Sequence, residues 1–149
     1  YLIQFNFLIS LKFMSKNNIG FTCSAFDLLH AGHILMLKDA KNQCDYLIVG
    51  LHSNPQIDRP NKNKPIQTLK ERKIQLEAVK YIDEILIYET ESELYEILKK
   101  INPDVRILGS DYMNKNFTGK DLNIPIYFHD RNHDFSSSNL RKKIYDNHL

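Results

Sequence analysis

The sequence contains no tryptophan, only two cysteines and almost no net charge. Cys23 and Cys44 lack the paired C-x-x-C spacing, so neither a disulfide framework nor a thiolate zinc site is indicated, and a reducing compartment such as the cytoplasm fits best. A formal charge of +2 over 149 residues gives no support to a nucleic-acid partner, because duplex binders concentrate lysine and arginine on one face.

Long apolar runs are missing as well. The most apolar stretch, residues 1–13, is interrupted by four polar residues and is too short to span a bilayer as a helix, so no membrane partner is expected. It also lacks the basic start and the small-residue cleavage site of a secretory signal. We interpret residues 1–13 as an N-terminal extension and residues 14–149, which begin at Met14, as one domain.

Strand-like and helix-like segments alternate along that domain. Apolar segments of strand length occupy residues 19–25, 46–51, 84–88, 105–109 and 125–128. Helical periodicity covers residues 32–43, 69–81, 92–101 and 137–146, and residues 53–68 form a basic, proline-containing loop without periodicity. This alternation predicts an α/β fold, a single doubly wound, Rossmann-like domain with a parallel sheet.

The loop after the first predicted strand carries two histidines around a glycine, at His30, Gly32 and His33. Ligands of open α/β sheets bind beyond the carboxyl ends of the strands, often at this first loop. A helix that begins here presents unpaired N–H groups and a positive dipole end, which together favour a phosphate. Taken alone, the two histidines could also be polar residues at a helix start or part of a metal site, but no third ligand at metal spacing is present.

Five segments in the right order carry a resemblance to a known family. They are residues 26–33 (Phe-Asp-Leu-Leu-His-Ala-Gly-His), 69–72 (Leu-Lys-Glu-Arg), 81–85 (Tyr-Ile-Asp-Glu-Ile), 109–112 (Gly-Ser-Asp-Tyr) and 131–138 (Arg-Asn-His-Asp-Phe-Ser-Ser-Ser). Together they resemble the cytidylyltransferase-like nucleotidyltransferases that carry the HxGH motif, and they are most similar to glycerol-3-phosphate cytidylyltransferases. The resemblance implies transfer of a nucleotide from a triphosphate bound with Mg²⁺, and it implies a homodimer.

The resemblance also implies roles for individual residues. His30 and His33 would be catalytic, with positive charge from Arg131 and from either Lys62 or Lys64. Residues expected to bind the nucleotide are Ser24, Ala25, Phe26, Gly32, Arg72, Gly109, Asp111, Ser136, Ser137 and Ser138. Non-functional explanations exist as well: the three serines could simply cap the last helix, and the basic residues could lie on a solvent-exposed loop and helix face.

Three positions, Ser24, Ala25 and Asp27, allow more than one interpretation. Asp27 is expected to orient a histidine or to bind the acceptor, and equally to accept hydrogen bonds from loop N–H groups. Family members often have Gly-Thr directly before Phe-Asp, whereas this chain has Ser24 and Ala25. The exchange adds a side chain where backbone would approach phosphate, which makes altered turnover or an unusual acceptor possible.

The sequence therefore predicts an enzyme that transfers CMP from CTP to a phosphorylated small molecule similar to glycerol 3-phosphate. An alternative is an adenylyltransferase similar to those that activate heptose phosphate, because residues 109–112 resemble that group too. A nucleotide-binding module without catalysis is the alternative from another class.

Overall fold

The computed structural model describes residues 18–148, so the proposed extension at residues 1–13 lies outside the described part. Strands and helices alternate as the sequence predicts. They are β1 Ile19–Ser24, α2 Ala31–Asn42, β2 Tyr46–His52, α3 Leu69–Glu77, β3 Glu84–Tyr88, α4 Glu91–Ile101, β4 Val105–Gly109, β5 Ile126–His129 and α5 Ser137–Asp146. Within residues 18–148 no helix combines the length and the apolar character needed to cross a membrane.

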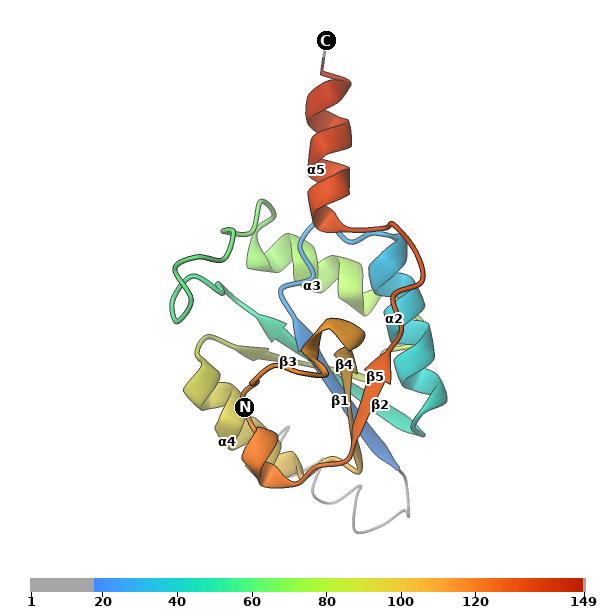
Figure 1. Cartoon of the computed structure of the whole chain (residues 1–149), viewed down its shortest axis with the longest axis vertical. Helices are drawn as coiled ribbons and strands as arrows, with labels where there is room; N and C mark the ends of the chain where they lie inside the picture. The colour runs from blue at the N-terminus through green and yellow to red at the C-terminus, as the bar shows by residue number, and fades with distance from the viewer. Residues whose placement is uncertain (1–17, 149) are drawn as a thin grey trace.

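The five strands form one parallel sheet in the order β3-β2-β1-β4-β5. The chain first winds outward from β1 to β3 and then returns to the other side of β1 with β4. Helices α2 and α3 cover one face and α4 covers the other (Figure 1). The prediction of a doubly wound α/β domain is confirmed, and the order reverses between β1 and β4, where such folds hold their ligands.

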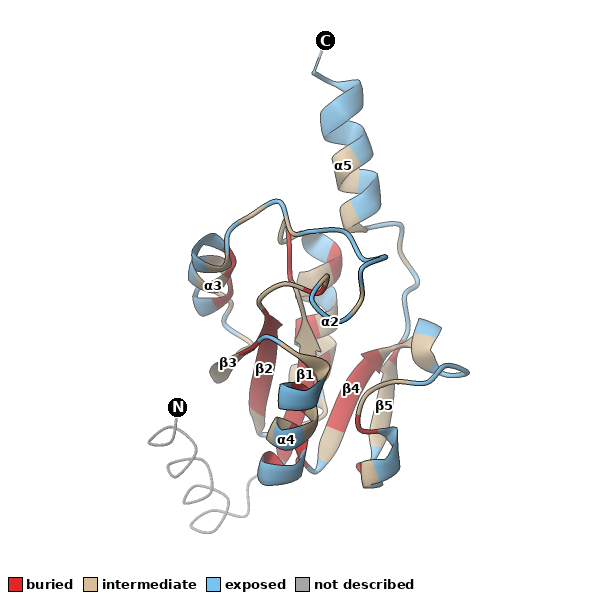
Figure 2. Cartoon of the chain, turned by 90° about the vertical axis from the view of Figure 1, so that its left-hand side faces the viewer, coloured by how far each residue is buried: buried red, intermediate tan, exposed pale blue. Residues whose placement is uncertain are grey.

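The central strand β2 shows why the sheet forms from continuous apolar runs. Its residues Leu47, Val49 and Leu51 pack in the cluster that includes α2 and α3, whereas Ile48 packs in the cluster that includes α4. All four are fully buried, and Figure 2 shows that burial concentrates in the strands. A strand covered on both faces has no polar alternation, as its sequence predicts.

Helix α3 is shorter than predicted, whereas helix α5 has the predicted bounds but packs little against the rest of the domain. Helix α3 ends at Glu77 rather than at residue 81, because tight turns follow in which Val79 N–H donates to Leu76 O and Ile82 N–H to Val79 O. Helix α5 stands away from the body of the domain and buries none of its residues (Figure 1).

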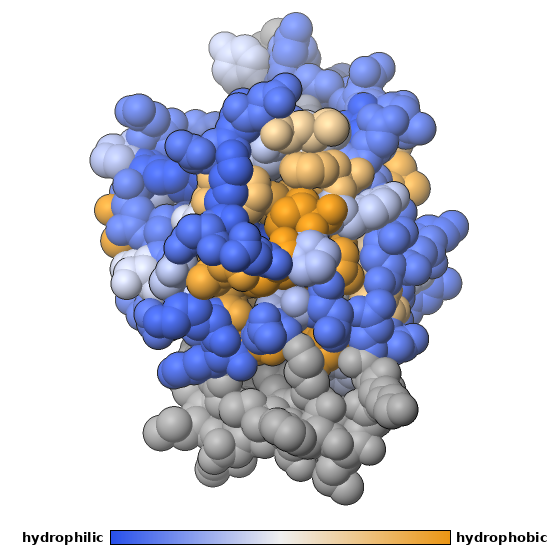
Figure 3. Space-filling view, turned by 60° about the horizontal axis from the view of Figure 1, so that its bottom comes forward, coloured by the Kyte–Doolittle hydropathy of each residue, from blue (hydrophilic) through white to orange (hydrophobic). Residues whose placement is uncertain are grey.

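On the face seen in Figure 3, apolar side chains gather near the centre among mostly hydrophilic ones.

Candidate active site

A cavity of about 580 Å³ opens where the strand order reverses. This volume is within the usual range for small-molecule sites. Thirteen of the residues expected from the sequence line it, namely Ser24, Ala25, Phe26, Asp27, His30, Gly32, His33, Lys62, Gly109, Asp111, Arg131, Ser137 and Ser138. Three expected residues, Lys64, Arg72 and Ser136, are not among the lining residues.

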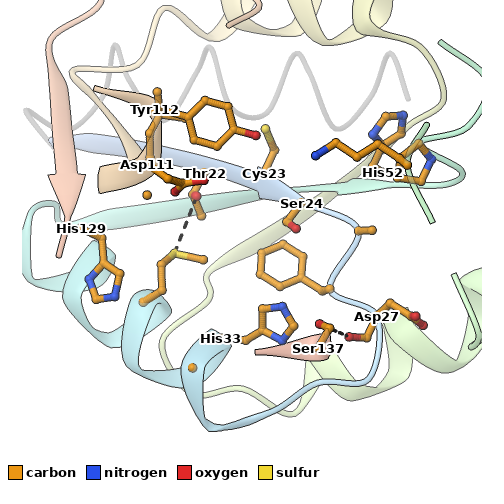
Figure 4. A pocket seen from close by; sticks show the side chains of 18 of the residues that line it. Thr22, Cys23, Ser24, Asp27, His33, His52, Asp111, Tyr112, His129 and Ser137 are labelled. Atoms are coloured by element: carbon orange, nitrogen blue, oxygen red, sulfur yellow. Dashed lines mark hydrogen bonds between the residues drawn. The ribbon is translucent and has the colours of Figure 1, made fainter. Parts of the chain in front are cut away.

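The start of α2 meets the start of α5 at this cavity. His30 Nε2 lies 3.3 Å from Ser137 Oγ, across 107 residues of sequence. Ser137 Oγ in turn donates to the Asp27 carbonyl at 3.4 Å, the contact drawn in Figure 4. The imidazoles and the serine-led helix therefore converge on one space from opposite ends of the domain.

The two histidines cap α2 with each other. His30 Nδ1 accepts from Gly32 N–H at 3.1 Å, and His33 Nδ1 accepts from His30 N–H at 3.3 Å. Their rings stack with centroids 3.9 Å apart. Because both Nδ1 atoms are acceptors, the proton of each neutral ring is on Nε2. Each histidine is thus fixed as an Nε2–H donor.

Both rings are held in the neutral form. Burial lowers the pKa of His33 to about 3, and the nearby charges of His30 and Arg131 act in the same direction. The pKa of His30 is lowered first by burial and then by Arg131 and His133. At neutral pH the site offers neutral hydrogen-bond donors beside a fixed arginine cation.

The loop between β1 and α2 is strained. Phe26 and Leu28 have φ values of 48° and 51°, in the left-handed region that non-glycine residues rarely adopt. Phe26 is buried against the His33 ring, with centroids 5.4 Å apart, and Leu28 N–H donates to the Gln67 side chain at 2.9 Å. Such strain persists where surrounding contacts enforce it, and it is frequent at functional sites.

Arg72, which the sequence analysis expects to bind the nucleotide, supplies several of those contacts. The side chain is 2% exposed, and its guanidinium donates to four backbone carbonyls. These belong to Gln67, Ala25, His52 and Ser53, at 2.6 to 3.1 Å. With its donors committed to the backbone, Arg72 ties together the loops that follow β1 and β2.

The Asp27 carboxylate accepts hydrogen bonds from loop N–H groups, which is one of the alternatives expected for it. It accepts from Ile66 N–H and Gln67 N–H, both at 2.9 Å, and pairs with Arg141 at 2.9 Å. Burial raises the pKa of Asp27, but the hydrogen bonds and the charge of Arg141 lower it by more, so the pKa is below its usual value. Asp27 joins the β1–α2 loop to the basic loop and to α5, and an acceptor would have to displace one of these partners.

Gly32 is required for packing. A Cβ at this position would lie 2.9 Å from Phe135 O and 3.0 Å from both His133 Cε1 and His30 Cε1. The missing side chain allows the segment before α5 to cross the start of α2. The same absence was expected to admit phosphate, so the glycine has a structural reason that the sequence did not reveal.

The other expected residues divide between the cavity and its surroundings. A Cβ on Gly109 would lie 2.5 Å from Asp111 Oδ1 and 3.8 Å from Arg131 Nε, so these three residues form one side of the cavity. Ser136 caps α5 by accepting from Asn139 N–H at 3.1 Å, which was its structural alternative. Of the two candidate lysines, only Lys62 lines the cavity.

Several lining residues were not assigned a role from the sequence. They are Arg59, Arg106 and Arg141, and the histidines His52, His129 and His133. Arg141 lies four positions after Ser137, a spacing that places both on one helix face. Arg106 was visible as a charge inside an apolar strand. Figure 4 places His52 and His129 toward opposite ends of the cavity.

The described residues hold no dedicated metal cluster. Within residues 18–148, no three histidine, cysteine or carboxylate side chains come together in a way that could hold a metal ion. Asp111 is a cavity-lining carboxylate, whereas the Asp27 carboxylate is occupied by two N–H groups and Arg141.

Comparison with known proteins identifies the family to which the chain belongs. A family model described as Cytidylyltransferase-like matches residues 21–143. The chain is 36% identical over 135 residues to the bifunctional protein HldE of Helicobacter hepaticus, covering 90% of this chain and 28% of that protein. It is 33% identical over 140 residues to HldE of Campylobacter jejuni subsp. jejuni serotype O:6, covering 93% and 30%. It therefore spans less than a third of these relatives.

Two solved structures share the fold. The lipopolysaccharide core biosynthesis protein from Thermoplasma volcanium aligns with a TM-score of 0.57 and 23% identity, over 87% of this chain and 88% of that one. The pantoate-beta-alanine ligase from Francisella tularensis aligns with a TM-score of 0.60 and 20% identity, over 95% and 76%. At these identities the likeness shows the fold alone.

Proposed function

The chain belongs to the cytidylyltransferase-like family of nucleotidyltransferases, and we propose that it joins a nucleotide to a phosphorylated small molecule and releases pyrophosphate. The observation that carries the proposal is the 3.3 Å approach of His30 Nε2 and Ser137 Oγ. It creates one polar cradle from a histidine-capped helix start and a serine-capped helix start, each suited to phosphate oxygens.

The chemistry is an in-line displacement. An oxygen of the acceptor phosphate forms a bond to the α-phosphorus, and the bond from that phosphorus to the bridging oxygen of pyrophosphate breaks. Negative charge grows on the oxygens around phosphorus, so catalysis depends on positioned donors and fixed charge. We assign this task to the Nε2–H groups of His30 and His33 and to Arg131, with Ser137 and Ser138 at the remaining phosphates.

Mg²⁺ would enter with the triphosphate. Magnesium ions at such sites are held mainly by phosphate oxygens and water with one or two carboxylates, so a full protein cage is unnecessary. Asp111 is a lining carboxylate that could take this part. The ion would supply charge neutralisation at the phosphates.

For the donor and acceptor we place ATP and a sugar phosphate ahead of CTP and glycerol phosphate, which reverses the order expected from the sequence. Residues 109–112 resemble the adenylyltransferases that activate heptose phosphate, and the named relatives are HldE proteins. The similarity to the cytidylyltransferase-like family model keeps CTP as the second candidate.

Purified protein incubated with each nucleoside triphosphate and a panel of phosphorylated acceptors tests the proposal. We expect pyrophosphate from ATP with a sugar phosphate, and from neither substrate alone. Consumption of CTP in place of ATP would make CTP the donor, as the sequence analysis expects. Calorimetric binding of a triphosphate with no pyrophosphate from any acceptor would instead identify a binding module. Light scattering of the same sample tests the homodimer.

A further inference from the structure

One lobe of the cavity lies on the α4 side of the sheet. Tyr88 of β3 and Leu94 of α4 line it and belong to the core cluster on that side. Phe117, from the connection between β4 and β5, and Arg106 of β4 also line the cavity. The neighbour of Arg106, Ile107, packs in the opposite cluster, so the alternation of β4 directs Arg106 to the α4 side.

Arg106 is a buried cation that has no anionic partner within residues 18–148. The residue is 2% exposed, and its guanidinium lies 5.3 Å from the centre of the Phe117 ring. Nη1 donates to the carbonyl of Thr118, but Nε is buried and has no hydrogen-bond partner. Among residues 18–148 no carboxylate is in ion-pair contact with Arg106; the nearby Glu91 pairs with Arg59 instead. A buried charge left in this state is costly.

Arg72 shows what a purely structural buried arginine looks like in the same domain. It has the same 2% exposure, but its Nε, Nη1 and Nη2 all donate to carbonyls. Arg106 reaches one carbonyl and leaves Nε unpaired. The contrast indicates that the partner of Arg106 is not among residues 18–148, and the cavity that Arg106 lines has room for a ligand that would supply it.

We propose that Arg106 binds a second acidic group of the acceptor, a carboxylate or a phosphate remote from the phosphate that reacts. This inference rests on the proposed nucleotidyl transfer. The imidazoles and Ser137 hold the triphosphate at the starts of α2 and α5, and α2 covers the opposite face of the sheet from α4. A nucleoside triphosphate has no acidic group besides its phosphates, so an anion in the α4-side lobe comes from the acceptor.

Matched acceptors test this assignment. Glucose 1-phosphate and glucuronic acid 1-phosphate differ only in one carboxylate, as do glycerol 3-phosphate and 3-phosphoglycerate; glucose 1,6-bisphosphate tests a second phosphate as the anion. Each is titrated by calorimetry into protein saturated with a non-hydrolysable triphosphate analogue, and kcat/KM is measured in parallel. We expect the acidic member of at least one pair to bind at least about tenfold more tightly, as for a hydrogen bond to a charged group.

Arg106→Gln should abolish that preference and leave the affinity for the triphosphate unchanged, whereas Arg106→Lys should retain part of it. Lys99→Gln is the matched control, since it removes one positive charge from the exposed face of α4, where Lys99 pairs with Glu96. A structural role for Arg106 would weaken both members of a pair equally.

Equal or absent binding of the acidic and neutral members to the unaltered protein overturns the assignment, even if Arg106→Gln does not fold. So does a preference that survives in Arg106→Gln. The proposed function fails separately, by absence of pyrophosphate from every acceptor, because the calorimetric preference does not require turnover.

Discussion

Replacement of Arg72 by methionine tests whether this arginine stabilises the fold or binds the nucleotide. Methionine preserves much of the apolar volume but removes every donor of the guanidinium. Four carbonyls would lose their partner, those of Gln67, Ala25, His52 and Ser53. The loops after β1 and β2 would then no longer be held to the start of α3.

The expected cost follows from these four bonds. An unsatisfied buried acceptor costs about 1–3 kcal/mol, but the costs are not additive, and removing a buried cation returns part of the free energy. We expect a loss of about 4 kcal/mol in the free energy of unfolding. This is a large part of the roughly 5–15 kcal/mol typical of a domain, and it corresponds to a fall in Tm of about 10–15 °C for a chain of this size.

Urea and thermal unfolding followed by circular dichroism measure this loss. Lys73→Met is the matched control, since Lys73 is the next residue, is about half exposed and pairs with Glu77 on the helix surface. An exposed pair of this kind contributes about 0–1 kcal/mol, so Lys73→Met should unfold nearly as the parent protein does. A saturating triphosphate should restore part of the Tm of Arg72→Met, because ligand binding stabilises the folded state.

The reasoning is refuted if Arg72→Met unfolds at the same urea concentration and temperature as the unaltered protein while its KM for the triphosphate rises. That pattern would give Arg72 the direct nucleotide contact expected from the sequence.

Three further predictions concern the start of α2 and its neighbours. His33→Ala should lower kcat at least about 100-fold in the pyrophosphate assay with a much smaller change in triphosphate affinity by calorimetry, and undiminished turnover would remove His33 from the mechanism. Burial lowers the pKa of His33 from about 6.5 in the unfolded chain to about 3 in the folded protein, so the unfolded chain binds more protons between these values and stability should fall as pH drops below about 6.5. Melting curves of His33→Gln should show a shallower fall, and an unchanged slope would contradict the neutral buried ring. Gly32→Ala should cost about 1–3 kcal/mol in urea unfolding because its Cβ would meet Phe135 O at 2.9 Å, and wild-type stability would show that the crossing segment moves freely.

The strands could be predicted from the sequence because burial on both faces leaves continuous apolar runs such as residues 46–51. The end of α3 could not. Nothing local in Ala78 and Val79 stops a helix, and the turn that begins there depends on packing of Val79 and Ile82 against the core. Helix ends set by tertiary contacts are not encoded in periodicity.

Within the site, sequence patterns located the groups but not their partners. The motifs around His30 and Ser137 were identified by type and spacing, and their meeting was predicted from the family resemblance. The direction of Arg72 was hidden because a basic residue on a helix has the same sequence signature whether it faces a ligand or four carbonyls. The role of Asp27 was left open for the same reason, because the sequence does not give the positions of Ile66, Gln67 and Arg141 around its carboxylate.

The spacing of the histidine motif has a physical basis that joins folding to chemistry. A helix start needs acceptors for its free N–H groups, and serine or threonine paired with glutamate usually supplies them. Here His30 and His33 do so through Nδ1. Using Nδ1 as the acceptor forces the proton onto Nε2, which is the atom that faces Ser137 and the cavity in His30. An asparagine could cap the helix in the same place, but its shorter side chain would leave no donor at the position that Nε2 reaches.

Gly32, between the two histidines, must also lack a side chain, because the backbone of Phe135 crosses there and brings α5 to the site. His30, Gly32 and His33 therefore start helix α2, fix the Nε2–H tautomer and leave space for the start of α5 beside them.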